Sequence, residues 1–531
     1  MNATAIITFA CVILAVIFIS WYKRQKSNTA LSLLFADKRL GYVAIACALY
    51  FTNISATEFI GGSQSSYINN MSVMAWGVSS VLAMLIVSEF IIPIYLRGGM
   101  LTTPDFLERR YDVATKKLAS VMFLISYMVN TLPVILYGGA VAVNGLFHFS
   151  DNWKFGHFNM ICILIFCVAF IGLIYSTSGG LRSIVVSDML LAIGLFIGGF
   201  LFLYFAFKHL GNSSLEQGIH VITSSQKSHL NAIGSSGDAV PFSTIFTGML
   251  IINLFYWGTE QVIVQQALAG KSLVDIQKGI AIASIGKLLA PVLFIIPGVI
   301  AVHLMPGLQN SVEVFPRMVS LATPAVITGI IGTVMFGSVI TAFSATLNSA
   351  STLFIFNIYK PYHEKKTGQV SEKNVLKAAK RFEVLTCVLA MCIAPLIFFV
   401  RGDFYTYIQK MNACFSIPIF AVMFAGFITK WITPFAAKTG LVFCVTGYII
   451  TQAFLKLPLH YLHALFILFL TTILLMAVIS KLFPSKLSAP YYSSQPAAQL
   501  EYWTYRHVAA AILLLLMVGV FLFFSRFGIA G

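Results

Sequence analysis

The sequence predicts an all-α membrane protein with about fourteen transmembrane helices. Three observations point to this class. Of the 531 residues, 58% are hydrophobic and only 10% are charged, and the mean hydropathy is +0.88, so the chain cannot cover its apolar surface as a water-soluble protein does. Apolar runs of about 20 residues, the length that crosses a bilayer as a helix, recur along the chain. Basic residues gather in alternate connections between these runs, which is typical of cytoplasmic loops.

The candidate spans follow one another with mostly short connections. In order, they are residues 3–21, 41–62, 74–96, 118–145, 157–177, 183–206, 241–265, 276–304, 322–357, 379–400, 404–428, 435–455, 459–480 and 507–527. The first run does not have the pattern of a cleaved signal peptide, because its basic residues follow the apolar stretch instead of preceding it. We therefore expect it to stay as an anchor helix.

The charge distribution predicts an orientation. A net charge of +16 would suggest nucleic-acid binding in a soluble protein, but here the basic residues of cytoplasmic loops account for it. If residues 22–40 are cytoplasmic, the basic clusters at 97–117 and 358–378 lie on the same side, and we read 358–378 as a long solvated loop. The predicted location is the cell membrane, a bacterial inner membrane, with both termini facing outward. The bilayer is then a partner and nucleic acid is not.

Three spans contain polar or charged residues that a passive anchor does not need. The second carries Asn53 and Glu58, the eighth carries Lys287, and the ninth contains GSVITAFSATLNSAS at 337–351. Charge inside the membrane together with a broken helix indicates a path for a substrate or an ion. Polar and small residues also join helices to one another, so for any one of these residues close packing is an equal explanation.

Four ordered motifs resemble a known family. YSTSGGLRS at 175–183 looks like the signature of sodium/solute symporters. NISATEFIGGSQSSY at 53–67, NLFYWGTEQVIVQQALAGKS at 253–272 and SATLNSASTLFIFNIYKPY at 344–362 resemble segments of its sodium/glucose and sodium/galactose cotransporter branch. The similarity extends over about residues 35–435.

This resemblance implies a LeuT-type inverted repeat around a site near the middle of the membrane, with the first helix of each half broken there. The two five-helix halves are residues 41–206 and 241–428. The remaining parts are an anchor helix and cytoplasmic loop at 1–40, an extracytoplasmic loop at 207–240 and accessory helices at 429–531.

The resemblance also implies that sodium is the coupling ion. Its ligands would be the carbonyls of Phe51, Ile54 and Ser338 and the hydroxyl of Thr341. The family usually has a second hydroxyl where this chain has Ala342, so this cage of oxygen ligands has one oxygen fewer than is usual. The cage could bind sodium weakly, recruit a water molecule or accept another ion. Some members build a further sodium site from an acid and a hydroxyl, which here would be Asp188 and Ser344. A helix-packing or capping role for Asp188 is the alternative.

For the solute, the branch's pocket positions fall on Asn53, Glu58, Gly77, Ser80, Asn253, Tyr256, Lys287 and Gln409. Such side chains pair with hydroxyl groups and offer an aromatic face, and Tyr256 would also be the inner gate. Two positions depart from the branch, which has a carboxylate at Gly77 and a neutral or basic side chain at Glu58. Glu58 could accept sugar hydroxyls, pair with Lys287 or select a positively charged ligand.

The predicted function is sodium-coupled uptake of a small polar solute, a sugar or polyol, by alternating access. The alternatives are a different solute, cationic or zwitterionic such as betaine, or sialic acid, and a transport-inactive sensor. An enzyme is not expected, because the chain lacks metalloprotease H-E-x-x-H and hydrolase G-x-S-x-G motifs.

Overall fold

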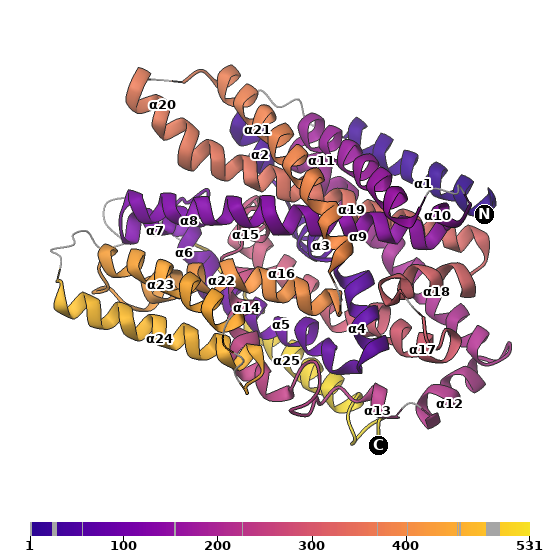
Figure 1. The fold of residues 1–531 in the computed structure, drawn as a ribbon. Helices are drawn as coiled ribbons and strands as arrows, with labels where there is room; N and C mark the ends of the chain where they lie inside the picture. Colours follow the sequence, from indigo (N-terminus) through magenta and orange to yellow (C-terminus); the bar gives the residue numbers. More distant parts are fainter. Residues whose placement is uncertain are drawn as a thin grey trace.

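The computed structural model in Figure 1 shows a bundle of long helices. It describes residues 3–23, 29–55, 57–152, 156–225, 227–308, 310–368, 370–400, 402–453, 455, 458–484 and 500–531. Within these residues the regular structure is helical, apart from a single bridge between Leu40 and Gly270.

The helices have the following bounds. They are α1 (Ala3–Tyr22), α2 (Ala30–Phe35), α3 (Tyr42–Asn53), α4 (Ser63–Ile68), α5 (Ala75–Ile86), α6 (Ile92–Arg97), α7 (Pro104–Arg110), α8 (Val113–Ser126), α9 (Leu132–Phe147), α10 (Phe149–Asn152), α11 (His157–Leu210), α12 (Leu215–Ser225), α13 (Lys227–Leu230), α14 (Gly248–Gly258), α15 (Gln261–Leu268), α16 (Leu273–Ala290), α17 (Ile296–Leu304), α18 (Val314–Ala322), α19 (Ala325–Phe354), α20 (Lys360–Thr367), α21 (Glu372–Ile393), α22 (Phe404–Ile428), α23 (Pro434–Ala453), α24 (Tyr461–Leu482) and α25 (Arg506–Phe523). Wider π-helical turns lie at Thr57–Gly62, Val87–Ile91, Tyr127–Thr131, Pro291–Ile295 and Ile355–Tyr359.

The number of spans agrees with the sequence. In the described residues, twelve helices are long and apolar enough to cross a membrane, and a bent pair, Tyr42–Asn53 with Glu58–Ile68, makes a thirteenth. The run predicted at 241–265 contains α14, which has 11 residues, and α15 follows it after a short break. The twelve long helices, the bent pair, and the short helices α14 and α15 counted as one interrupted span correspond to the fourteen predicted spans.

Helix α11 holds two spans joined at a glycine. Its backbone leaves helical geometry at Gly180, where φ is 59° and ψ is −171°, a conformation that glycine adopts without strain. A Cβ at Gly180 would also lie 2.6 Å from the carbonyl oxygen of Leu33 in α2. The paired glycines of YSTSGGLRS therefore allow α11 to turn sharply while its backbone packs closely against α2.

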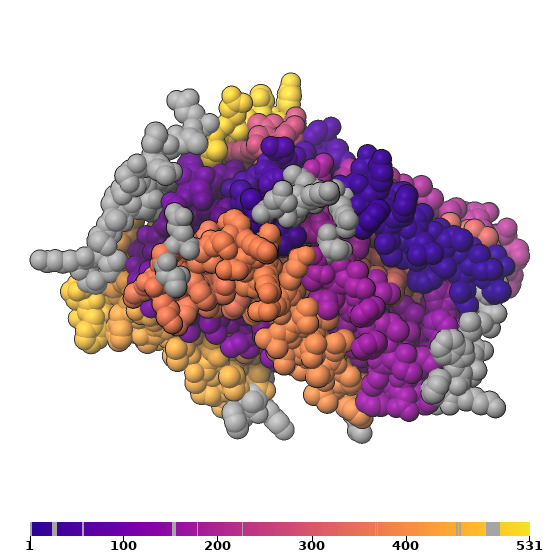
Figure 2. Space-filling view, turned by 90° about the horizontal axis from the view of Figure 1, so that it is seen from above, coloured from indigo at the N-terminus to yellow at the C-terminus, as the bar shows by residue number. Residues whose placement is uncertain are grey.

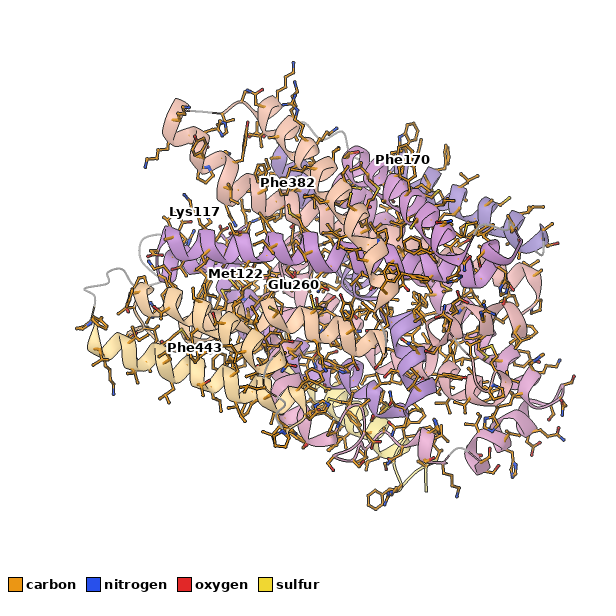
Figure 3. The ribbon with its side chains drawn as sticks, viewed as in Figure 1. Lys117, Met122, Phe170, Glu260, Phe382 and Phe443 are labelled. Carbon is orange, nitrogen blue, oxygen red and sulfur yellow. The ribbon has the colours of Figure 1, made fainter. Side chains whose placement is uncertain are left out.

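The outer surface of the bundle is apolar. Leu14, Phe166 and Phe170 are more than half exposed, and α1, α11 and α21 form one continuous face in Figure 2. Phe170 lies at the edge of the bundle in Figure 3, and Phe443 on α23 is also exposed. Such a surface is stable in lipid and not in water, which agrees with the composition.

The basic connections lie at one end of the bundle. In Figure 1, α7 and α20 lie at the same end and the N terminus lies at the opposite one. The predicted loop at 358–378 is mostly helical instead: α20 continues from α19, and Gly368 at φ 82° ends it. The cause is that Lys and Glu favour helix, with Lys360 and Glu364 paired four residues apart.

Candidate substrate and cation sites

A cavity of about 170 Å³ lies inside the bundle, beside the breaks of α3 and α14. Seven of the predicted solute-binding residues line this one cavity: Asn53, Glu58, Ser80, Asn253, Tyr256, Lys287 and Gln409. They come from both predicted halves, so the tertiary structure brings together positions up to several hundred residues apart.

The first break exposes backbone carbonyls. Helix α3 ends at Asn53, and the Ser55 N–H donates to the Asn53 carbonyl at 3.0 Å instead of to Phe51. The Glu58 N–H likewise donates to Ser55 at 3.0 Å instead of to Ile54. The carbonyls of Phe51 and Ile54 thus lose the donors that a continuous helix would supply. Both are predicted cation ligands, and carbonyl oxygens without donors suit a hard cation.

The side chains of the predicted cation site lie on α19 and α11. Thr341 is buried and its hydroxyl donates to the Ser338 carbonyl at 3.2 Å. The carboxylate of Asp188 faces Thr341 and is fully buried, and neither of its oxygens has a hydrogen-bond partner in the described part of the chain. A buried carboxylate without a partner is costly, so a cation beside Thr341 would stabilise it.

Two other residues of this region have different surroundings. The Ser344 hydroxyl donates to the Gly172 carbonyl on α11 at 3.0 Å, which leaves its oxygen lone pairs for a cation. Ala342, where the resemblance implied a hydroxyl, lines the solute cavity together with Thr346. A hydroxyl at position 342 would therefore lie at the boundary between the two sites.

In the solute cavity, Glu58 pairs with Lys287. The Lys287 Nζ lies 3.2 Å from Glu58 Oε1, and the two side chains are 3% and 15% exposed. Of the three roles left open for Glu58, the structure shows this one. The pair links the turn after the first break to α16, and each member compensates the other's charge.

The remaining predicted residues are held by neighbours. Asn253 donates to the Ser79 hydroxyl at 3.1 Å, Ser80 donates to the Gly77 carbonyl at 2.6 Å, and the Tyr256 hydroxyl faces Asn53. Gly77 itself lines a smaller adjoining cavity with Glu58. A Cβ there would meet no atom closer than 3.9 Å, so a side chain fits at this position.

Sequence reasoning missed several residues of the cavity wall. Trp76 and Tyr405 line it with their rings edge to face, 6.4 Å apart. Asn130 donates to Asn412 at 2.6 Å, and both line it too. Glu260, which lies in the break between α14 and α15, lines the cavity as well. Its carboxyl group accepts a hydrogen bond from the Tyr127 hydroxyl, and Figure 3 shows Glu260 near the middle of the bundle. The sequence feature that could have identified Glu260 is an acidic residue within the motif NLFYWGTEQ.

Residues 34–443 match the profile of the sodium:solute symporter family. The chain belongs to this family. It is 33% identical to an uncharacterized symporter of Escherichia coli K12, YidK, over 99% of this chain and 92% of that one. It is 26% identical to the sodium/glucose cotransporter of Vibrio parahaemolyticus, over 90% of each.

Among solved structures, the symporter's fold matches a substrate-bound, outward-open Na⁺-coupled sialic acid symporter. The TM-score is 0.78 at 17% identity, over 91% of this chain and 98% of that one. The fold is therefore the LeuT type that the motifs implied, and the protein is a multi-pass membrane transporter, not an enzyme. Sodium is its coupling ion.

Proposed function

We propose that this symporter takes up a sugar or polyol by alternating access, with the solute in the cavity at the two breaks and sodium at the cage beside it. The observation that carries the proposal is that seven of the eight positions expected to form the solute pocket line one cavity, and the eighth, Gly77, lines the cavity next to it. Amides, hydroxyls and a charged pair can satisfy several hydroxyl groups, and Trp76, Tyr256 and Tyr405 offer ring faces for the apolar side of a sugar.

The first break supplies the coupling between ion and solute. Phe51 and Ile54 would bind sodium with Ser338 and Thr341, while Asn53 in the same break borders the cavity. A sodium ion that orders the backbone of this break also fixes the position of Asn53 in the cavity. Binding of sodium therefore favours binding of the solute, and binding of the solute favours binding of sodium. Asp188, with Ser344, would hold a sodium ion at a further site or on its way inward, and Tyr256 would close the inner side.

The alternatives are less well supported. A sialic acid carboxylate would need a cationic partner, and Lys287 already pairs with Glu58. A transport-inactive sensor would keep the same site and differ only in the absence of flux.

We also propose that the protein lies in a bacterial inner membrane with both termini outward. The basic ends of α7 and α20 favour the cytoplasmic side for that end of the bundle, and two of the relatives are bacterial.

The test is uptake into proteoliposomes with an imposed inward sodium gradient, against labelled hexoses, inositols, sialic acid, proline and betaine. We expect sodium-stimulated uptake of one or more hexoses or inositols. Sodium-driven uptake confined to sialic acid, proline or betaine would overturn the proposed substrate class. Binding of a sugar with no uptake would identify a sensor.

A further inference from the structure

One acidic side chain of the solute cavity has no basic partner. Among the described residues, three Asp, Glu, Lys or Arg side chains line the cavity: Glu58, Glu260 and Lys287. Glu58 and Lys287 pair with each other at 3.2 Å. Glu260 has a neutral donor, the Tyr127 hydroxyl, and no basic group of the described residues lies within ion-pair distance of it. A buried carboxyl of this kind takes up a proton unless a cation lies beside it.

None of the predicted sodium ligands is Glu260. The cage at Thr341 uses the carbonyls of the first break, and Asp188, which faces Thr341, has no hydrogen bond to either oxygen in the described part of the chain. With sodium at those residues and a neutral sugar in the cavity, Glu260 would have no cation beside it and would be protonated, because a lone charge in the middle of the membrane is strongly disfavoured.

Two local features partly offset the cost of ionising the buried Glu260. It directly precedes Gln261, the first residue of α15. The amino end of a helix carries partial positive charge, which stabilises the anion. The hydrogen bond from Tyr127 adds to this effect.

The cavity that Glu260 lines also offers unpartnered oxygen atoms. Asn130 Oδ1 and Ser416 Oγ have no hydrogen-bond partner in the described part of the chain. Both residues line the cavity and are only 2% exposed. The Asn130 amide nitrogen already donates to Asn412. Asn53 Oδ1, on another side of the cavity, is unpartnered as well.

We propose that the solute carries a cationic nitrogen beside its hydroxyl groups, as an amino sugar or amino polyol does, and that Glu260 selects it. This inference rests on the proposed function, since it names a class within the sugars and polyols. A primary ammonium has three donors and no acceptor, which suits the Glu260 carboxylate and the unpartnered oxygens of Asn130 and Ser416 in the wall of the same cavity. Its positive charge would pair with the ionised form of Glu260.

The experiment measures sodium-driven uptake in proteoliposomes for three matched sugars: glucosamine, N-acetylglucosamine, which has the same ring without the charge, and glucose. The wild type is expected to have an apparent affinity for glucosamine on the order of tenfold higher than for either neutral sugar. Galactosamine with its two neutral counterparts repeats the comparison on a second ring.

Three variants separate charge from hydrogen bonding. Glu260→Gln removes the charge and keeps an acceptor for Tyr127, so the ratio of amine to neutral affinity should fall to about one. Glu260→Asp and Tyr127→Phe both keep the charge and should keep a ratio above one. If Glu260→Gln transports nothing, equilibrium binding of the same sugars to the purified variant gives the ratio.

The outcomes distinguish this inference from the proposed function. Uptake of glucose or galactose with no preference for the amine, or a preference that persists in Glu260→Gln, overturns the role of Glu260 and leaves sugar transport intact. Sodium-driven uptake of sialic acid, proline or betaine with no uptake of any sugar, amino or neutral, overturns the proposed function itself.

Discussion

The two broken helices at the cavity use opposite ends of a helix. At the first break, α3 ends and presents the carbonyls of Phe51 and Ile54, the negative end of its dipole, which suits a cation. At the second break, α15 begins after Glu260 and presents the positive end, which stabilises a carboxylate. The acid after the first break, Glu58, is paired with Lys287, whereas Glu260 is not. One break is thus suited to the ion and the other to a charged part of the solute.

The change with the largest expected effect on this comparison is Thr341→Ala. Its hydroxyl is the predicted side-chain ligand that completes the carbonyls of the first break, so we expect sodium stimulation of uptake to be lost. Sodium dependence of uptake and of solute binding measures this. Thr333→Ala is a matched control, because its buried hydroxyl donates to Gly329 at 3.0 Å, two turns earlier on the same helix. Unchanged sodium dependence in Thr341→Ala would remove the cation from the first break.

The next change is Asp188→Asn. A buried carboxylate without a partner destabilises the sodium-free protein, so its removal should raise stability without sodium by about 1–3 kcal/mol. The stabilisation that sodium gives should shrink at the same time. Thermal unfolding in sodium chloride and in choline chloride measures both. If Asp188→Asn loses stability in choline, Asp188 has a structural partner and the cation assignment is wrong.

The role of Glu58, the acid that follows the first break and pairs with Lys287, can be tested by transferring the carboxylate to position 77. Glu58→Gln should weaken solute binding by roughly 1.5–3 kcal/mol, because it leaves Lys287 unpaired and removes a charged acceptor. Adding Gly77→Glu should recover part of the loss, since Gly77 borders Glu58 and has room for a side chain. Competition binding of galactose, glucose, inositol and betaine at fixed sodium measures both variants.

A control for this series is Glu89→Gln, which breaks the Glu89–Arg506 pair at 3.1 Å outside the cavity and should not change solute affinity. Equal affinities in wild type and Glu58→Gln would show that the pair does not contribute to the pocket. Complete failure of Gly77→Glu to recover binding would indicate that the acid is needed at its present wall.

The smallest expected effect is that of Ala342→Ser. It restores the hydroxyl that the family usually has, and one added ligand contributes on the order of 1 kcal/mol, a factor of several in the half-saturating sodium concentration. Sodium titration of uptake measures it. Since Ala342 borders the solute cavity, the same titration at low and high solute shows whether the two sites affect each other. Weaker sodium binding in Ala342→Ser would mean that the cage is adapted to alanine.

The sequence by itself determined the class, the number of spans and the place of the first break. Span length is set by the thickness of the bilayer, and the first break follows from residues that are neighbours in the chain, at Asn53–Ser55. These are local properties. The glycine turn at Gly180 is of the same kind, because its conformation depends on the residue itself. The eighth and ninth spans, whose polar residues also suggested interruption, are continuous in the structure.

Only the tertiary structure decided which polar groups meet. Glu58 and Lys287 are separated by 229 positions, and three roles for Glu58 were equally compatible with the sequence. The placing of Asp188 opposite Thr341, and the hydrogen bond from Tyr127 to Glu260, depend on how the helices rotate and pack. A residue's type determines which partner it needs inside a membrane, but the helix packing determines which partner it receives. For Glu260 that packing supplies the Tyr127 hydroxyl and no basic side chain among the described residues.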